Sequence, residues 1–493
     1  MNLYGEIEMP RKTIFMLAIF TFFGVAAYLL VSAWVYRIGF PLDDSWIHLT
    51  YARNLSLRGE WSFIPGQNSA GSTSPLWTGL LAIGYFLKLG PYLWPFFLGG
   101  LILFLLAWRV EYILRKMQPA YKPSVPWAGL VILSEWHLAW AAVSGMEILL
   151  HALLIMVVLS MLFLNSQRFL LIGILTGLSI WSRPDGLTLL GPLVLFALLQ
   201  PATFQQKASA LGRIVLGFAA LFVPYLLFNL LLSGTPWPNT FYAKQVEYAD
   251  WQVQPAYNKL LALLPQYFSG ATLLLLPAVV LLVLKAVQKR GWGVLLSFTW
   301  LLGYIWIYVS RLPVYQHARY LMPTIPVFLV LGLIFLIFWL PIVRTRIQRN
   351  VRFAWLFSLG AFSFLFWVWG AQIYAQNVAW IESEMVETAQ WVARNLPPET
   401  LVAAHDIGAL GYFGNRNQIV DLAGLISPEI VPFMRDEAQV FSYIQNLNAT
   451  HVIVFPLWYP SLIKECLLVY QADGRYAGLN PLGILSVYEC PKP

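Results

Sequence analysis

Long apolar runs alternate with short polar segments over the first three quarters of the chain. Between residues 13 and 374 these runs are long enough to cross about 30 Å of hydrocarbon as helices. After about residue 376 the pattern changes to short β-like runs separated by helical stretches. The pattern therefore predicts a helical membrane domain over residues 1–375 and an appended α/β domain over residues 376–493.

The basic residues indicate how the apolar runs cross the membrane. They lie in separate clusters between the runs, and cytoplasmic loops of membrane proteins carry an excess of Lys and Arg. One arrangement places every cluster in the cytoplasm, together with the N-terminus, and places the C-terminal domain outside. Its eleven spans cover residues 13–35, 92–113, 125–142, 147–165, 169–182, 187–200, 214–232, 271–286, 292–310, 320–342 and 353–374.

The apolar segment 75–89 does not fit this arrangement as a span. Counting it would move the basic cluster at residues 115–122 to the outside, and the segment is also short before Gly90 and Pro91 interrupt it. It is predicted to be a re-entrant or interfacial helix.

Composition agrees with a multi-pass protein of the cell membrane. The chain is 59% hydrophobic and 11% charged, against roughly a quarter charged in soluble domains. Its net charge of +8 is spread over the loop clusters, which argues against a nucleic-acid partner and for the lipid bilayer.

Two adjacent carboxylates, Asp43 and Asp44, stand at the start of the first predicted outer stretch, residues 36–74. The residues that follow have helical spacing, which predicts an amphipathic helix on the membrane surface with an Asp as its N-cap. Two carboxylates exceed what a cap needs. Neighbouring like charges raise one pKa, and such a carboxylate can act as a general base toward a hydroxyl. Asp43 is the first candidate for this base and Asp44 the second.

Further ionisable residues lie at the predicted outer ends of spans, where they are rare unless functional. Glu147 adds another carboxylate, which could also be a helix N-terminal charge. Arg183, Lys244 and Arg319 are cations that could hold a phosphate at the boundary between water and lipid. The alternatives are a local ion pair of Arg183 with Asp185 and snorkelling for Lys244 and Arg319.

These motifs resemble, in the same order, those of GT-C fold glycosyltransferases, the closest subgroup being the bacterial one with mycobacterial-type arabinofuranosyltransferases. The matching segments are Asp43-Asp44 through Asn54, Pro65-Gly66, Gly71 through Trp77, Ser144 through Glu147, Arg183 through Gly186, Pro238 through Lys244, and Arg319 through Pro323. The resemblance spans essentially the whole membrane domain.

The resemblance implies an inverting transfer of one hexosyl or pentosyl unit from a polyprenyl-phosphate donor to an acceptor hydroxyl. The acceptor would be a glycan, lipid or protein of the cell envelope, outside the cytoplasm. Asp43 would take the acceptor proton while Lys244 and Arg319, with Arg183, would steady the lipid phosphate. Motif residues expected to contact substrate are His48, Tyr51, Asn239, Tyr242, His317 and Tyr320.

Some relatives carry Asp where this chain has Glu147, which leaves the role of Glu147 and any metal dependence open. The sequence requires no cofactor, although clustered carboxylates could bind Mg²⁺ or Ca²⁺. The donor sugar and the acceptor are not readable from the chain.

A membrane transporter or flippase for a glycolipid is the alternative function. Transporters usually place ionisable residues near the bilayer midplane and often contain repeats. Here the ionisable residues collect at one predicted face, and no repeat is found.

The C-terminal domain is predicted to hold a polar helix over residues 385–396 and strands over residues 400–404, 418–422, 451–455, 466–470 and 485–488. The segment His405 through Gly411 is predicted to be a structural turn from strand to helix, because it lacks the third glycine of a phosphate-binding loop. Members of the resembled group carry similar domains, which implies a part in acceptor binding. Cys466 and Cys490, the only two cysteines, are predicted to form a disulfide between the last two strands, paired antiparallel.

Overall fold

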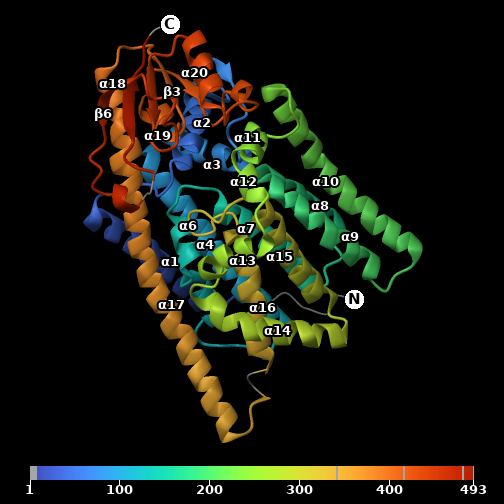
Figure 1. Cartoon of the computed structure of the whole chain (residues 1–493). Helices are drawn as coiled ribbons and strands as arrows, with labels where there is room; N and C mark the ends of the chain where they lie inside the picture. Colours follow the sequence, from blue (N-terminus) through green and yellow to red (C-terminus); the bar gives the residue numbers. More distant parts are fainter. Residues whose placement is uncertain (1–7, 340–341, 415–416, 480–481, 492–493) are drawn as a thin grey trace.

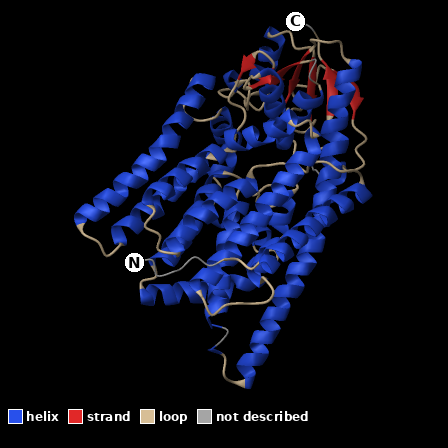
Figure 2. Ribbon diagram, turned by 180° about the vertical axis from the view of Figure 1, so that it is seen from behind, coloured by secondary structure: helices blue, strands red, loops and turns tan. Residues whose placement is uncertain are grey.

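The computed structural model describes residues 8–339, 342–414, 417–479 and 482–491. A bundle of long helices carries a small unit with a β-sheet at one end, and the C-terminus lies in that unit (Figures 1 and 2). We call the end of the bundle beneath the sheet the outer end, following the predicted orientation.

The bundle consists of helices that match the predicted spans. They are α1 (Arg11–Val35), α4 (Gly90–Met117), α5 (Trp127–Leu133), α6 (Trp136–Ala142), α7 (Ile148–Phe163), α8 (Phe169–Ser182), α9 (Leu190–Leu199), α10 (Phe204–Ser233), α14 (Ala271–Lys289), α15 (Trp292–Arg311), α16 (Ile325–Trp339) and α17 (Arg346–Ile381). Within the described residues, six helices are long and apolar enough to cross a membrane by length and composition alone, and several shorter apolar helices accompany them. The chain is a multi-pass membrane protein.

The predicted single helix over residues 125–142 is wrong, because the structure divides it into α5 and α6. Glu135, between them, has an extended backbone (ψ 114°). Its carboxylate lies 2.7 Å from Nδ1 of His137, whose Nε2 lies 2.9 Å from the carbonyl oxygen of Gln266. Both side chains are buried. The break places the buried carboxylate of Glu135 within hydrogen-bond distance of the buried imidazole of His137. The apolar sequence pattern does not reveal this contact.

Several shorter elements connect the helices of the bundle. They are α2 (Asp44–Arg58), β1 (Ser62–Ile64), β2 (Gln67–Asn68), α3 (Pro75–Phe86), the 3₁₀ segments η1 (Pro184–Leu189) and η2 (Met322–Thr324), α11 (Asn239–Glu247), α12 (Ala249–Gln252) and α13 (Ala256–Tyr267). The sequence predicts no helix over the α11–α13 stretch, which lies between the predicted spans 214–232 and 271–286. The predicted interfacial helix at 75–89 is present as α3, which packs on α2 and α4.

The helix predicted at residues 44 onward is present as α2, but it does not lie on the surface of the membrane domain. Its residues from Ser45 to Ala52 are buried, and α2 packs between α3 and α19 of the C-terminal domain. The ring of Trp46 contacts the rings of Tyr412 and Phe413, with centroids 4.8 and 4.7 Å away. The prediction of a surface helix fails because the large apolar and aromatic side chains of α2 are covered by α3 and by the C-terminal domain.

The C-terminal domain continues directly from the bundle. α17 runs without a break into the π-helix η4 (Glu382–Val386) and α18 (Glu387–Asn395), so no interruption marks residue 375. The remaining elements are β3 (Leu401–Ala404), α19 (Gly408–Phe413), β4 (Gln418–Asp421), η5 (Pro428–Ile430), α20 (Glu437–Asn446), β5 (His451–Val454), β6 (Leu467–Gln471), η6 (Ala477–Leu479) and β7 (Ser486–Glu489). The strand order is β4-β3-β5-β7-β6, with β4, β3 and β5 parallel and β7 antiparallel to both neighbours. The α/β prediction and the strand-to-helix turn at His405 are confirmed.

Two charged side chains of the α2 region hold both ends of α19. The carboxylate of Asp43 accepts hydrogen bonds from the backbone N–H groups of Gly408 (2.6 Å) and Ala409 (2.8 Å). The guanidinium of Arg53 donates to the carbonyl oxygens of Gly411 (3.1 Å) and Tyr412 (2.6 Å). These are backbone groups that a short helix leaves unpaired at its ends. We call this set of contacts the α2–α19 clamp.

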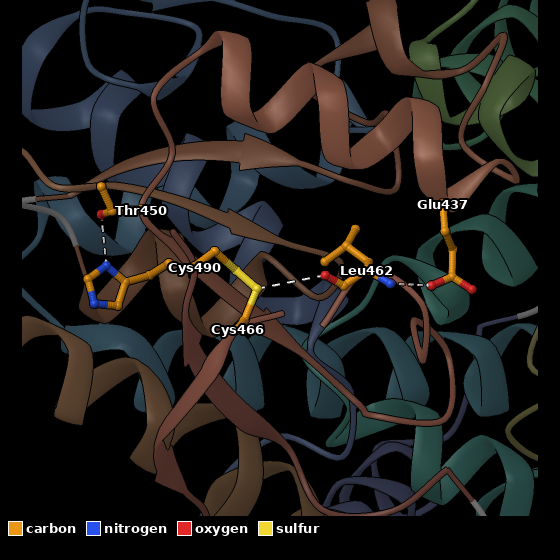
Figure 3. The surroundings of a disulfide bond; sticks show 6 residues. Glu437, Thr450, Leu462, Cys466 and Cys490 are labelled. Carbon is orange, nitrogen blue, oxygen red and sulfur yellow. Dashed lines mark hydrogen bonds between the residues drawn. A yellow bond between two sulfur atoms is a disulfide. The ribbon is translucent and has the colours of Figure 1, made fainter. Parts of the chain in front are cut away.

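The predicted disulfide is confirmed. Cys466 and Cys490 are bonded, with their Cα atoms 4.2 Å apart, and they flank the antiparallel pair of β6 and β7. Figure 3 shows the bridge and the contact of the Cys466 sulfur with the carbonyl oxygen of Leu462 at 3.7 Å. The bridge closes the β6–β7 hairpin covalently.

Removing the disulfide should destabilise the C-terminal domain. A loop of about 25 residues closed by the bridge contributes on the order of 3 kcal/mol through the entropy of the unfolded chain. We expect Cys466→Ser/Cys490→Ser to lower the melting temperature of the purified protein, and thiol alkylation of the wild type to require prior reduction. Alkylation of both cysteines in the unreduced, folded protein would contradict the bridge.

Gly408→Ala should loosen the α2–α19 clamp. A Cβ at Gly408 would overlap the backbone oxygen of Asp43 and lie 2.7 Å from its carboxylate. We expect a loss of about 1–3 kcal/mol, as for other overpacked positions, measured as a lower melting temperature and faster proteolysis of the C-terminal domain. Gly79→Ala in α3 is the matched control, because a Cβ there meets nothing within 4 Å. Equal stability of the two variants would contradict the clamp.

Candidate active site

A carboxylate and two cations meet beneath the C-terminal domain. Oδ2 of Asp44 lies 2.6 Å from Nη2 of Arg319, which also donates to the hydroxyl of Tyr320 at 3.0 Å. The ammonium of Lys244, on α11, donates to the same hydroxyl. The side chain of Asp44 is 38% exposed.

The ring of Tyr320 is the centre of the cation cluster. Lys244, Arg319 and Arg183 lie 4.7, 4.9 and 5.4 Å from its centroid. Its other neighbour is the ring of Tyr308 on α15, stacked at 5.7 Å. The electron-rich ring moderates the repulsion among three positive charges that a bound anion would neutralise further.

Arg319 retains unused hydrogen-bonding capacity. Its side chain is buried, and among the described residues its Nε and Nη1 atoms have no hydrogen-bond partner. Buried polar groups in native structures are nearly always paired, so an unpaired guanidinium edge is an indication of ligand binding. The three residues before it, Gln316 to Ala318, all have positive φ (49°, 61° and 56°). Such backbone strain is concentrated at functional sites.

A cavity of about 140 Å³ adjoins the cluster. Lys244, Arg183 and Tyr320 line it, together with Thr73 and Tyr308. Arg311 and the carboxylate of Asp185 also line it, so cations outnumber carboxylates in a space that suits a small anionic group.

A buried network fixes Arg183. Its Nη1 lies 2.6 Å from Glu147, its Nε lies 2.8 Å from Asp185, and its Nη2 donates to Tyr308 at 3.1 Å. The local Arg183–Asp185 ion pair weighed from the sequence is therefore present, and Glu147 joins it.

Glu147 also contacts the candidate residue His48. Nε2 of His48 lies 3.3 Å from the second carboxylate oxygen of Glu147, and its Nδ1 contacts Ser72 and Thr78 at 3.2 and 3.1 Å. Both Glu147 and His48 are buried. Neither residue is part of the cavity lining. Glu147 holds Arg183, and His48 contacts Glu147.

Asp43 and Asp44 have opposite environments. Asp43 is engaged in the α2–α19 clamp, and burial raises its pKa to about 6 although the N–H groups of Ala409 and Gly408 oppose the shift. Burial would also raise the pKa of Asp44, but the positive charges of Arg319 and Lys244 outweigh it and hold that pKa below its ordinary value. Asp44 is therefore the carboxylate that faces the cations and is held ionised by them.

The other predicted substrate residues lie outside the cation cluster. His317 Nε2 contacts Asn377 at 2.9 Å, and the His317 ring packs on Trp136 and Trp140. The hydroxyl of Tyr51 contacts Ser69 at 2.6 Å and accepts from the backbone of Gly71. Asn239 donates to the carbonyl oxygen of Leu425 at 3.0 Å, and Tyr242 contacts the ring of Phe241.

Tyr308 was missed from the sequence because it lies within an apolar run. Its hydroxyl donates to Asp185 and accepts from Arg183, so it belongs to the site. The signal available was a pair of tyrosines, Tyr304 and Tyr308, one helical turn apart at the end of a predicted span. As for metals, within the described ranges no group of three or more His, Cys, Asp or Glu side chains is arranged to hold an ion.

Comparison with known sequences gives limited information. A family described as a domain of unknown function (DUF8728) matches residues 371–481, which cover the end of α17 and most of the C-terminal domain. No curated protein matches the chain significantly.

Comparison with solved structures identifies the fold. The crystal structure of apo ArnT from Cupriavidus metallidurans has a TM-score of 0.61 at 15% identity, covering 96% of this chain and 97% of that one. ArnT from the same organism bound to undecaprenyl phosphate has a TM-score of 0.57 at 14% identity, with the same coverage. Arabinofuranosyltransferase AftD from Mycobacteria has a TM-score of 0.45 at 13% identity, covering 99% of this chain and 42% of that one. Its structural similarity to ArnT, a GT-C glycosyltransferase, shows that the chain has the GT-C fold, as its motifs predicted.

Proposed function

We propose that this protein is a membrane glycosyltransferase that moves one sugar from a polyprenyl-phosphate donor to an acceptor hydroxyl at the outer face. The observation that carries the proposal is that a partly exposed carboxylate, Asp44, pairs with Arg319 close to a cavity whose lining includes Lys244 and Arg183. ArnT has been solved with undecaprenyl phosphate, which supports a lipid phosphate as the ligand of such a fold. The site is equally compatible with a hexose or a pentose as the donor sugar. It is also compatible with a glycan, a lipid or a protein as the acceptor.

The orientation of the chain belongs to the same proposal. The N-terminus is cytoplasmic, and the C-terminal domain and the candidate site are extracytoplasmic. The basic clusters in the predicted cytoplasmic loops support this orientation, as does a disulfide in the C-terminal domain, because disulfides persist in oxidising compartments.

The reaction is a single displacement with inversion. Asp44 accepts the proton of the acceptor hydroxyl as its oxygen attacks the anomeric carbon of the donor sugar. The bond between the anomeric carbon and the phosphate oxygen breaks, and the lipid phosphate leaves with the electron pair. The proton ends on Asp44, so atoms and charge balance without a further reactant.

The contacts favour Asp44 over Asp43 as the base, which reverses the order ranked from the sequence. Both oxygens of Asp43 accept backbone hydrogen bonds, whereas Asp44 is partly exposed and held ionised by Arg319 and Lys244. A base must be both deprotonated and within reach of the hydroxyl.

The cations stabilise the departing phosphate. Lys244 and Arg183 line the cavity, and Arg319 lies on the same tyrosine ring, Tyr320, that both of them contact. Negative charge develops on the leaving oxygens. Hydrogen-bond donors that are fixed in advance and shielded from water stabilise this charge most strongly. Glu147 and Asp185 fix Arg183 in this way.

Asp44→Asn should abolish transfer while donor binding is retained. The substitution keeps the shape but removes the proton acceptor, so we expect a loss of about 10²- to 10⁴-fold in kcat. Purified protein would be incubated with a panel of polyprenyl-phosphate sugars, and release of the lipid phosphate and labelling of the acceptor would be followed. Asp250→Asn, an exposed carboxylate paired with Arg435, is the control. Near wild-type transfer by Asp44→Asn would remove this residue from the mechanism.

Lys244→Met should impair use of the donor. Loss of a charge-assisted contact of about 1.5–3 kcal/mol corresponds to a fall of roughly 10- to 150-fold in kcat/KM for the donor. Gln245→Ala changes an uncharged residue of the same cavity and serves as the control. Equal donor kinetics in the two variants would mean that the phosphate is bound elsewhere.

A further inference from the structure

A second cavity, of about 1010 Å³, lies between α1, α5, α16 and α17. α5 and α17 begin at this end of the bundle and α16 ends here, so the cavity lies toward the end opposite the C-terminal domain. Figures 1 and 2 show the first turns of α17 extending past the other helices at this end. We call this cavity, with the lining residues 353–367 of α17 and 20–27 of α1, the inner groove.

The inner groove is apolar and open. Within the described residues no charged side chain lines it. Among its lining residues, Phe23 of α1 and Phe353 and Phe357 of α17 are 64%, 72% and 67% exposed. Rings so exposed on a multi-pass protein face hydrocarbon rather than water. The groove therefore opens to lipid tails.

The length of the inner groove suits one leaflet of a bilayer. Its lining on α17 runs from Phe353 to Trp367, roughly 21 Å at the rise of an α-helix. One leaflet contributes about 15 Å of hydrocarbon. A Cβ added at Gly360, midway along this lining, would meet nothing within 4 Å. The space beside α17 is therefore hollow over the length of an acyl chain.

Exposed cations continue from the apolar lining toward the membrane surface. Lys122 directly follows the lining residue Tyr121. Arg349 and Arg346 lie four and seven residues before the lining residue Phe353, on the same side of α17. These side chains form a rim at the end of the groove.

α1 adds a cation to this rim. Nη2 of the buried Arg115 donates to the carbonyl oxygen of Pro123 at 3.2 Å and lies 3.5 Å from the hydroxyl of Thr13, which joins the start of α1 to the segment that carries Lys122. Lys12, the neighbour of Thr13, is exposed. It lies three helical turns before the lining residue Phe23, on the same side of α1.

The rim carries an excess of positive charge. The sequence has no Asp or Glu between residues 112 and 134 or between residues 251 and 381. Glu111 is buried and paired with Arg115 at 2.7 Å, and in the sequence Glu6 and Glu8 precede Arg11 and Lys12. Basic groups that border transmembrane helices attract anionic lipid headgroups, and basic pockets between helices bind them.

We propose that the inner groove binds an anionic phospholipid, its acyl chains along α1 and α17 and its phosphate at the rim cations Lys12, Lys122, Arg346 and Arg349. The proposed orientation puts this lipid in the cytoplasmic leaflet, but its binding does not depend on the proposed reaction. The donor phosphate is a poorer occupant, because the candidate active site lies at the other end of the bundle. A second copy of the chain is also a poorer one, because it would bring two cationic rims together.

The lipid would stabilise the helix on which the C-terminal domain is mounted. α17 continues without a break into η4 and α18, and its first half forms one wall of the inner groove. A ligand that binds only the folded state raises the stability of that state. Phosphatidylglycerol should therefore raise the melting temperature of the wild type more than phosphatidylcholine does.

The test measures lipid retained by the purified full-length protein. Delipidated protein in detergent would be titrated with phosphatidylglycerol or phosphatidylcholine and examined by native mass spectrometry. We expect one phosphatidylglycerol to be retained at concentrations where phosphatidylcholine is not. Gly360→Leu, which fills the groove, and Arg346→Gln/Arg349→Gln, which removes about fivefold in affinity per cation, should each weaken this retention by about tenfold or more.

Matched controls separate the groove from the rest of the lipid-facing surface. Gly303→Leu adds the same side chain at an exposed position of α15 where a Cβ meets nothing within 4 Å. Lys207→Gln/Arg213→Gln removes two cations from α10, which Figures 1 and 2 show at the opposite side of the bundle from α17. Both controls should retain phosphatidylglycerol as the wild type does.

Equal retention of the two phospholipids by the wild type would overturn the inference, as would unchanged retention in either groove variant. Preferential retention of a polyprenyl phosphate, or a dimer that Gly360→Leu dissociates, would assign the groove to another occupant and also overturn it. Formation of the Cys466–Cys490 disulfide reports that each variant is folded and inserted correctly. If the arginine variant lacks the disulfide, Lys12→Gln/Lys122→Gln takes its place with the same expected loss.

Discussion

The α2–α19 clamp is the interaction on which the arrangement of the site depends. Asp43 and Arg53 lie ten positions apart on one short helical segment, and each satisfies backbone groups at one end of α19. The next residue after Asp43 is Asp44, so the backbone that docks the C-terminal domain also positions the carboxylate facing Arg319. Displacement of α19 would therefore alter both the cover of the site and the position of its acid.

The charged side chains of the site can be buried because each lies beside a group of opposite charge. Without that partner, burial would destabilise each of them. Arg183 is held by two carboxylates, Arg319 by Asp44, and the ring of Tyr320 lies among three cations. Leaving any of these groups buried without a partner would cost several kcal/mol. Among the described residues the Nε and Nη1 atoms of Arg319 have no partner, and under the proposed function the donor phosphate would supply one.

The spans could be predicted from the sequence because a chain in lipid must satisfy its backbone within helices, so the apolar runs and the basic loops between them indicate where the chain crosses. The sheet could be predicted because short strands alternate with helical stretches in this domain. The disulfide could be predicted because the two cysteines of the chain both lie there and can pair only with each other within the chain. The break at Glu135 could not, because its cause is a contact with His137 and with a distant carbonyl of Gln266. The burial of α2 depends on the C-terminal domain, which joins it from more than 350 residues away.

The contrast between Asp43 and Asp44 shows what a motif leaves undetermined. Adjacent residues at the start of a helix point about 100° apart, so the two carboxylates must meet different surroundings, and only tertiary contacts decide which one meets the cations. Under the proposed mechanism Arg319 is shared between Asp44 and the donor phosphate. Binding of the phosphate would draw positive charge away from Asp44 and raise its pKa, which makes it a stronger base only once the donor is in place. The geometry thus favours an order in which the donor binds before the acceptor hydroxyl is deprotonated.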